Sequence, residues 1–108
     1  MSPVKVKRIV VSDAARAGMS RCQAYLRERS QPAAARAQII IREGIKKLKD
    51  FPYHGRPYHR SPADLRELVI HFGKGAYLAL YRYDQREKTI YIVGFRHGAE
   101  EDYKELSY

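Results

Sequence analysis

The sequence predicts a small α+β fold in which a helical hairpin covers one face of a small antiparallel sheet. An alternating apolar segment at residues 4–11 precedes two segments with apolar residues at helical spacing, residues 13–29 and 32–50. Three segments rich in β-branched, leucine and aromatic residues follow within residues 65–97, separated by Gly73-Lys74-Gly75 and by a charged tetrapeptide. Such breaks are typical of successive β-hairpins. The expected order of elements is therefore β-α-α-β-β-β.

The length and composition of the chain limit its function classes. A chain of 108 residues is expected to form one domain, residues 1–108. Its formal net charge of +9 favours a nucleic acid or an acidic protein as partner, and charge alone does not separate the two. Cys22 is the only cysteine, so no internal disulfide forms and a reducing cytoplasm is expected. No apolar segment approaches the roughly 20 residues that span a bilayer, and no signal-peptide core is present near Met1, so no membrane association is expected.

The first half of the chain is predicted as a strand followed by two antiparallel helices. Residues 4–11 alternate apolar and basic side chains before an apolar end, as a strand that enters the core does. Ser12 suits a helix N-cap, and Ser30-Gln31-Pro32 ends the first helix and starts the second. This short connection predicts a helical hairpin. In the second helix, Ile39, Ile40 and Ile41 cannot all point inward, so either a partner covers part of this surface or the helix is well buried.

The connection at residues 51–63 contains glycine and three prolines, which predict no regular element. Its basic and aromatic side chains suit either contact with nucleic acid or packing against the helices. His54 and His59 are accompanied by no further ligands at a recognisable spacing, so no metal is expected.

Alternation along the three later strands divides their side chains between two apolar faces. In the middle strand, Tyr77, Ala79 and Tyr81 share one face, and Leu78 and Leu80 share the other. In the last strand, alternation places Tyr91, Val93 and Phe95 opposite Ile90 and Ile92. The helical hairpin should cover one face and leave a largely aromatic face for binding. A short terminal helix is expected from about Gly98.

Few of the patterns that carry enzyme chemistry are present. Gly73-Lys74-Gly75 lacks the strand-to-helix context of a phosphate loop, and no nucleophile elbow or zinc motif occurs. Acidic residues are few within the strands, which argues against a paired-carboxylate hydrolase or a metal-dependent nuclease. A metal-independent ribonuclease is an alternative, because it needs a base, cations for the phosphate and an acid. The residues available for it are His71, His97, Arg66, Arg82, Arg96 and Tyr103. No cofactor is implied.

The order of elements and three local patterns resemble the RelE/ParE superfamily of bacterial toxins from toxin–antitoxin modules. The patterns are Leu65-Arg66-Glu67-Leu68, Gly75-Ala76-Tyr77-Leu78-Ala79-Leu80-Tyr81-Arg82-Tyr83 and Ile90-Tyr91-Ile92-Val93-Gly94-Phe95-Arg96-His97-Gly98. The resemblance covers nearly the whole chain. It implies a toxin that a cognate antitoxin neutralises.

The resemblance further distinguishes two activities. RelE-like members resemble small ribonucleases that cut messenger RNA on the ribosome, with a cluster of basic residues on the sheet, whereas ParE-like members lack that cluster and inhibit DNA gyrase. Here Val69 and His71 occupy the two lysine positions and Leu78 occupies an arginine position, while Arg96 and Tyr103 match the remaining members. Loss of one donor to a transition-state charge typically costs about 10²–10³ in rate. The resemblance therefore favours the ParE type, a gyrase inhibitor that is not an enzyme.

The resemblance also suggests which residues bind partners. A ParE-like toxin would form a hetero-oligomer with its antitoxin, with candidate contacts at Ile39, Tyr77, Tyr81 and Tyr91. Candidate gyrase contacts are Arg56, Arg60 and Tyr103. The alternatives are a ribosome-dependent ribonuclease that uses Arg66, His71, Arg96 and Tyr103, and an inactive homologue that only binds the antitoxin.

Overall fold

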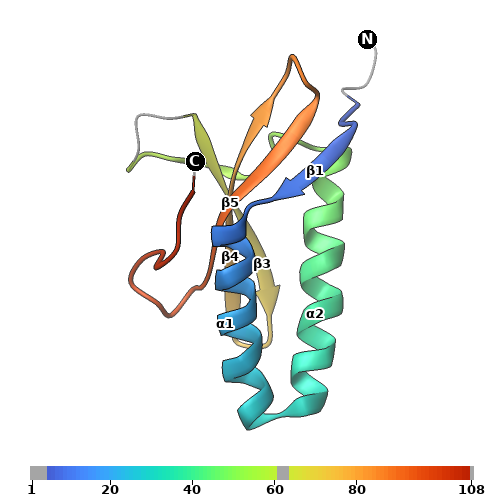
Figure 1. Ribbon diagram of the computed structural model, residues 1–108. Coiled ribbons are helices and arrows are strands. Elements are labelled where there is room, and N and C mark those ends of the chain that lie inside the picture. Colours follow the sequence, from blue (N-terminus) through green and yellow to red (C-terminus); the bar gives the residue numbers. More distant parts are fainter. Residues whose placement is uncertain (1–4, 61–63, 108) are drawn as a thin grey trace.

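The computed structural model describes residues 5–60 and 64–107 and packs two helices against one face of a five-stranded sheet (Figure 1). The predicted α+β class and the order of the main elements are confirmed. The helices are α1 (Asp13–Arg29) and α2 (Gln31–Lys46), which continues into a short 3₁₀ turn, η1 (Lys47–Lys49). The strands are β1 (Arg8–Val11), β2 (Arg56–Tyr58), β3 (Leu65–Phe72), β4 (Gly75–Asp84) and β5 (Thr89–His97). They lie in the order β1-β5-β4-β3-β2.

Two serines cap the helices of the hairpin, one at the start of α1 and one between α1 and α2. The Ser12 hydroxyl accepts a hydrogen bond from the Ala15 N–H at 3.1 Å, which caps the start of α1. Ser30 serves both helices, because its N–H donates to the Leu26 carbonyl at 2.8 Å and its hydroxyl accepts from the Ala33 N–H at 3.1 Å. A single residue therefore ends α1 and starts α2, as the short connection predicts.

The sheet is mixed, whereas the sequence predicted an antiparallel one. Strand β1 runs parallel to β5, with Ile9 beside Ile90 and Val11 beside Ile92. The two strands are joined through the helices and three further strands, so their pairing is not constrained to the antiparallel form of a hairpin. Strand β1 also begins later than expected, at Arg8, and Val4 lies outside the described residues.

Two further segments differ from expectation. The connection expected to be irregular contains the edge strand β2, in which Pro57 is tolerated because an edge strand need not donate every N–H. The expected C-terminal helix is absent from residues 98–107, which form turns and bends and reach back across the sheet. There Leu106 forms a bridge with Gly94, where an added Cβ would lie 2.6 Å from the Leu106 side chain. Packing against the sheet thus replaces helical hydrogen bonding in this tail.

The helices cover the aromatic face of the sheet, contrary to the expectation that this face is open. Tyr77 and Tyr81 are buried, and the Tyr77 ring stacks on Phe95 with centroids 5.6 Å apart. The helices can approach because they present small residues to the sheet. At Gly18, an added Cβ would lie only 2.3 Å from the Phe95 carbonyl oxygen. Large rings on the strands and small residues on the helices therefore fill one layer.

A register shift between β4 and β5 changes the face on which the end of β5 presents its side chains. Leu80 pairs with Gly94 and Tyr81 pairs with Ile92, so Val93 is an extra residue in β5. Phe95 consequently lies in the helix-covered core with Ile92, rather than beside Val93 as simple alternation predicted. The same shift turns Arg96 to the face away from the helices, opposite Leu78.

Candidate functional site

One cross-strand row lies on the face of the sheet away from the helices, called here the open face, and contains the positions that the resemblance compares with the basic cluster of RelE-like members. Val69 on β3 pairs with Leu78 on β4, which pairs with Arg96 on β5. Leu78 is buried and Val69 is half-buried. The row therefore contains two aliphatic side chains and one cation, and His71 lies exposed at the next position of β3 on the same face.

The one cation of this row is engaged by its neighbours. The Arg96 Nη2 atom lies 3.9 Å from the Glu67 Oε2 atom, and the guanidinium carbon lies 5.1 Å from the centre of the Tyr103 ring. A second guanidinium nitrogen donates to the Glu100 carbonyl. The Arg96 side chain is only 14% exposed. It thus links β5, β3 and the tail, and it shares the Glu67 carboxylate with Arg56.

Glu67 is the centre of this cluster, and sequence reasoning missed it as a site residue. Its carboxylate is buried, accepts from the Tyr103 hydroxyl at 2.6 Å, and accepts from the Arg56 Nε and Nη2 atoms at 3.0 and 2.7 Å. Burial and this hydrogen bond to Glu67 raise the pKa of Tyr103, so its hydroxyl remains a donor. Glu67 lies two residues before Val69 in the sequence, and strand alternation places residues at this spacing on the same face. This spacing is the signal that could have identified Glu67 as a site residue.

The residues proposed for a ribonuclease are divided between the two faces of the sheet. Arg66 lies on the helix-covered side, where it donates to the Gly55 carbonyl at 2.8 Å and lies over the Tyr53 ring. Arg66 and His71 are an odd number of residues apart in one strand, so they point to opposite faces. His97 also faces the helix side and packs edge-on against Tyr77 at 5.2 Å. His71, Arg82, Arg96 and Tyr103 share the other face, where Arg82 lies over the Tyr91 ring and Tyr103 is buried.

Residues 9–102 match the family described as the ParE toxin of type II toxin-antitoxin system, parDE. The chain belongs to the ParE toxin family. No curated protein matches the chain. The ParE family defines the chain as a type II toxin, a class that acts together with an antitoxin.

The ParE fold leaves some of the predicted partner contacts exposed and hides others. Ile39 on α2 is 58% exposed. Tyr91 is half-buried on the open face, beneath the Arg82 guanidinium at 4.2 Å from its ring centre. The expectation that Tyr77 and Tyr81 form an exposed surface is wrong, because both rings fill the layer beneath the helices. The Tyr81 hydroxyl donates to the Pro52 carbonyl and accepts from the Gly55 N–H, both at 2.8 Å, so it anchors the connection after α2.

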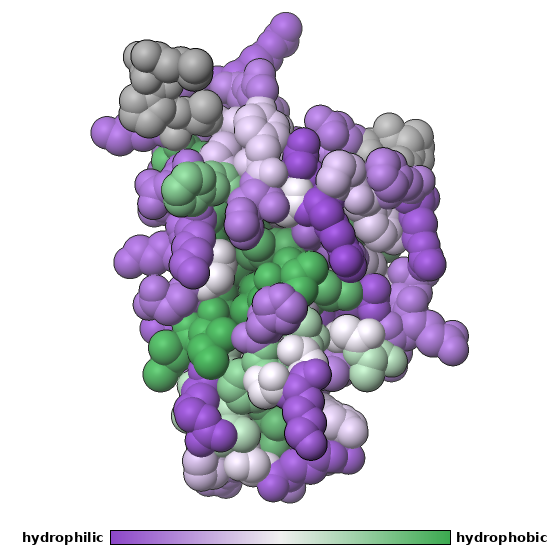
Figure 2. Space-filling view, turned by 180° about the vertical axis from the view of Figure 1, so that it is seen from behind, coloured by the Kyte–Doolittle hydropathy of each residue, from purple (hydrophilic) through white to green (hydrophobic). Residues whose placement is uncertain are grey.

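The candidate gyrase contacts of this ParE toxin also differ in exposure. The Arg56 and Arg60 side chains are mostly exposed, and Arg60 lies 3.7 Å from Asp102 in an exposed ion pair. The Tyr103 ring is covered, so only its surroundings are accessible. Figure 2 views the molecule from the side opposite to that of Figure 1. It shows hydrophobic surface gathered in the middle of this rear side and bordered by hydrophilic side chains.

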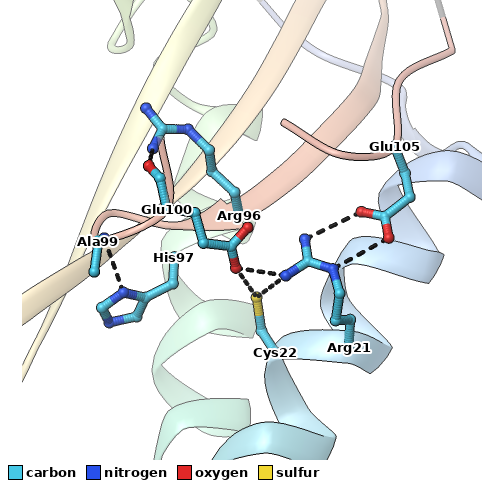
Figure 3. A network of polar contacts seen from close by, with 7 residues as sticks. All are labelled: Arg21, Cys22, Arg96, His97, Ala99, Glu100 and Glu105. Carbon is cyan, nitrogen blue, oxygen red and sulfur yellow. Dashed lines mark hydrogen bonds and ion pairs between the residues drawn. The ribbon is translucent and has the colours of Figure 1, made fainter. Parts of the chain in front are cut away.

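The tail of this ParE toxin is held against α1 by a single arginine (Figure 3). Arg21 contacts the Glu100 carboxylate at 2.5 Å and both Glu105 carboxylate oxygens at 3.1 Å. Burial favours the neutral form of Glu100, but the hydrogen bond and charge of Arg21 outweigh it and lower the pKa of this carboxyl. Cys22 lies beside this pair, and burial followed by the charge of Glu100 raises the pKa of its thiol to about 11.

The described part of this ParE toxin contains neither a metal-binding cluster nor a membrane-spanning helix. Residues 5–60 and 64–107 contain no group of three or more histidine, cysteine, aspartate or glutamate side chains placed to hold a metal ion. No helix in the same residues is long and apolar enough to cross a membrane.

Proposed function

We propose that this ParE-family toxin inhibits DNA gyrase by stalling it on cleaved DNA, and that a cognate antitoxin neutralises it. The observation that carries the gyrase assignment is the row Val69–Leu78–Arg96. Where a ribonuclease of this superfamily would gather cations, two of the three side chains are aliphatic and the third is paired with Glu67. The DNA chemistry would then belong to gyrase, and the toxin would not be an enzyme.

The electrostatics of the cluster support the same assignment. Cleavage of RNA requires positive charge that is free to stabilise the phosphorane and a base near the 2′-hydroxyl. Arg96 lies close to the Glu67 carboxylate, and the buried Tyr103 hydroxyl donates to the same carboxylate. These groups favour a role in holding the tail to the sheet.

The proposed partners fit the exposed residues. Ile39 presents an apolar side chain that only a partner would desolvate, and Tyr91 lies on the open face with its hydroxyl donating to Glu87 at 2.7 Å. Both suit the antitoxin of a hetero-oligomer. Arg60 and Arg56 suit gyrase because their side chains are exposed cations on one connection, next to the tail.

Two parallel assays on the purified toxin test this proposal. Gyrase supercoiling should be inhibited, with accumulation of cleaved DNA, while primer extension on translated messenger RNA should reveal no new cut. The reverse pattern, with cleavage lost in Arg96→Ala and gyrase unaffected, would establish the ribonuclease. Absence of both effects, with normal growth of the expressing cells, would favour an inactive antitoxin-binding homologue. Arg42→Ala on α2 serves as the matched arginine control.

A further inference from the structure

Basic side chains from three distant segments of the chain gather at one end of the molecule. Figure 1 shows that the start of β1, the end of α2 and the turn between β4 and β5 lie at the same end, opposite the connection between the two helices. The Lys7 N–H donates to the Lys88 carbonyl at 2.7 Å, which joins the residues before β1 to that turn. We call this region the basic end, and its exposed cations are Lys5, Lys7, Arg8, Lys46, Lys47, Lys49, Arg86 and Lys88.

The segment after η1 is also joined to the β4–β5 turn. The Tyr53 ring packs edge-on against the Tyr83 ring, with centroids 5.6 Å apart. The Gln85 side-chain amide donates to the Tyr53 hydroxyl. Because Tyr53 follows shortly after Lys49 in the sequence, these contacts hold the end of α2 and η1 beside the strand that leads into the turn.

Two buried aliphatic side chains fix the backbone of the basic end. Val6 stands between two of the lysines and Leu48 stands between two others. Both are buried and belong to the same hydrophobic core cluster, while the lysine on either side of each remains exposed. The Arg8 Nε atom donates to the Thr89 hydroxyl at 3.2 Å. The cations therefore project from an ordered backbone, which lowers the entropy cost of binding a ligand.

Few carboxylates offset the charge of the basic end. The acidic side chains of the same three segments are Asp50, Asp84 and Glu87. Glu87 accepts from the Tyr91 hydroxyl at 2.7 Å, and Asp84 accepts from the Glu87 N–H at 3.0 Å, so both are engaged within the β4–β5 hairpin. No ion pair joins a cation of the basic end to any residue that the structure describes. This surface therefore carries a net positive charge.

The dipole of α2 explains only part of this charge. Lysines at a helix C-terminus interact favourably with the negative end of the dipole, which accounts for Lys46 and Lys47. Strand β1 and the β4–β5 turn provide no comparable dipole, so their cations gain no such stabilisation. Bringing like charges together costs free energy, and a polyanionic ligand would offset that cost. The grouping therefore indicates a binding surface as well as a stabilised helix end.

We propose that the basic end binds the phosphate backbone of double-stranded DNA without reading its sequence. Duplex DNA carries one negative charge per about 1.7 Å of its axis, so a compact group of lysines and arginines can neutralise several phosphates at once. These cations lie at the ends of elements rather than along one face of a helix, which suits contacts with phosphates but not the reading of bases in the major groove. This inference goes beyond the inhibition of gyrase and does not depend on it.

An acidic protein fits the basic end less well than DNA does. A specific protein interface has an apolar centre within a polar rim. Here the aliphatic side chains between the lysines, Val6 and Leu48, are buried in the core and offer a partner no apolar contact. Charge is thus the main property that this surface presents, and phosphates are the ligands that charge alone binds.

Fluorescence anisotropy with the purified full-length toxin tests this binding. The probe is a fluorescein-labelled DNA duplex of about 20 base pairs at about 50 mM salt, for which we expect a Kd of about 1–100 μM. The logarithm of the association constant should fall with the logarithm of the salt concentration with a slope of about −3 or steeper. A second duplex of scrambled sequence should bind equally well.

Neutralisation of two lysines tests where the duplex binds. The double variant K7Q/K49Q should raise the Kd by about tenfold or more at low salt and make the salt slope shallower by about 2. The control K74Q/K104Q removes the same charge from exposed lysines of the β3–β4 turn and the tail, and it should alter the Kd by less than about threefold. Circular dichroism should be unchanged in both variants, because all four side chains are exposed.

Four results would overturn the inference. The first is the absence of duplex binding at low salt, and the second is equal weakening by the two double variants, which would reveal attraction to net charge alone. The third is binding of a duplex RNA of the same length about tenfold more tightly than the DNA, which would assign the surface to RNA. The fourth is binding of phosphatidylglycerol vesicles without binding of either duplex, which would assign it to a membrane. A toxin that binds no DNA alone and still stalls gyrase would overturn this inference and leave the proposed function intact.

Discussion

The Tyr103 hydroxyl donates to the Glu67 carboxylate at 2.6 Å across 36 residues of sequence, and both groups are buried. This bond ties the tail to β3 on the open face of the sheet. Arg56 and Arg96 approach the same carboxylate from β2 and β5. The cluster therefore joins four segments, namely the tail, β2, β3 and β5.

Removal of the Tyr103 hydroxyl tests this structural role. Tyr103→Phe should lower the free energy of unfolding by about 1–3 kcal/mol, because the buried Glu67 carboxylate loses a donor that water cannot easily replace. Urea denaturation measures the change. Tyr25→Phe, on an exposed ring, is the matched control and should stay within about 0.5 kcal/mol of the unmodified protein. Equal effects of the two variants would show that Tyr103 does not stabilise the tail.

The close approach of α1 to β5 predicts an asymmetric response of two glycines. Gly18→Ala should destabilise the protein by about 1–3 kcal/mol, because the new Cβ would lie 2.3 Å from the Phe95 backbone oxygen and α1 would have to move. Gly44→Ala should cost less, because its nearest neighbour is an Ile70 side-chain atom at 3.0 Å, and a side chain can adjust. Both variants gain the same helix propensity. Thermal unfolding compares them, and a larger loss at Gly44 would contradict this packing.

Alkaline pH should destabilise the fold. Burial raises the pKa of the Cys22 thiol to about 11, and burial with the Glu67 hydrogen bond raises that of Tyr103. A raised pKa means that the folded state retains a proton that the unfolded state releases, so stability falls as pH rises above the unfolded value, about 8.5 for cysteine. Urea titrations across pH 8 to about 11 measure this loss. Cys22→Ala should flatten the part of the curve between about 9 and 11, and an unchanged curve would contradict the assignment.

Exposed Ile39 is expected to contact a partner, whereas buried Tyr81 packs in the core, and substitutions at the two residues should therefore have different effects. Ile39→Asp should leave the free energy of unfolding within about 0.5 kcal/mol of its original value, yet weaken the antitoxin complex, because the side chain is exposed. Tyr81→Phe should destabilise the toxin by about 1–3 kcal/mol, because it strips partners from the Pro52 carbonyl and the Gly55 N–H. Calorimetry of binding and urea unfolding measure the two effects. An Ile39→Asp toxin that binds the antitoxin normally would remove α2 from the interface.

The differences between sequence and structure have physical causes. Alternation divides β4 into two faces, but both are apolar, so the pattern cannot say which face the helices cover. Small residues such as Gly18 on α1 were the available indication that large rings lie opposite. The extra residue Val93 exchanges the faces to which the side chains at the end of β5 point. Bulges of this kind arise from pairing between strands rather than from local composition.

The cluster around Glu67 escaped prediction for a similar reason. Its partners are distant in sequence, and an acidic residue within a basic chain gives no periodic signal. By contrast, the capped helical hairpin follows from Ser12 and Ser30, because capping is local. The sequence alone could also predict that Arg66 and His71 point to opposite faces, because this follows from strand alternation.

The central claim is that this toxin inhibits gyrase and does not cleave RNA. Titration of the purified toxin into a gyrase supercoiling reaction tests it most directly, with cleaved DNA as the readout. The account predicts loss of supercoiling together with cleaved DNA, and recovery when the antitoxin is added. Undiminished supercoiling at every toxin concentration, with cleavage of messenger RNA on translating ribosomes in the same preparation, would contradict it.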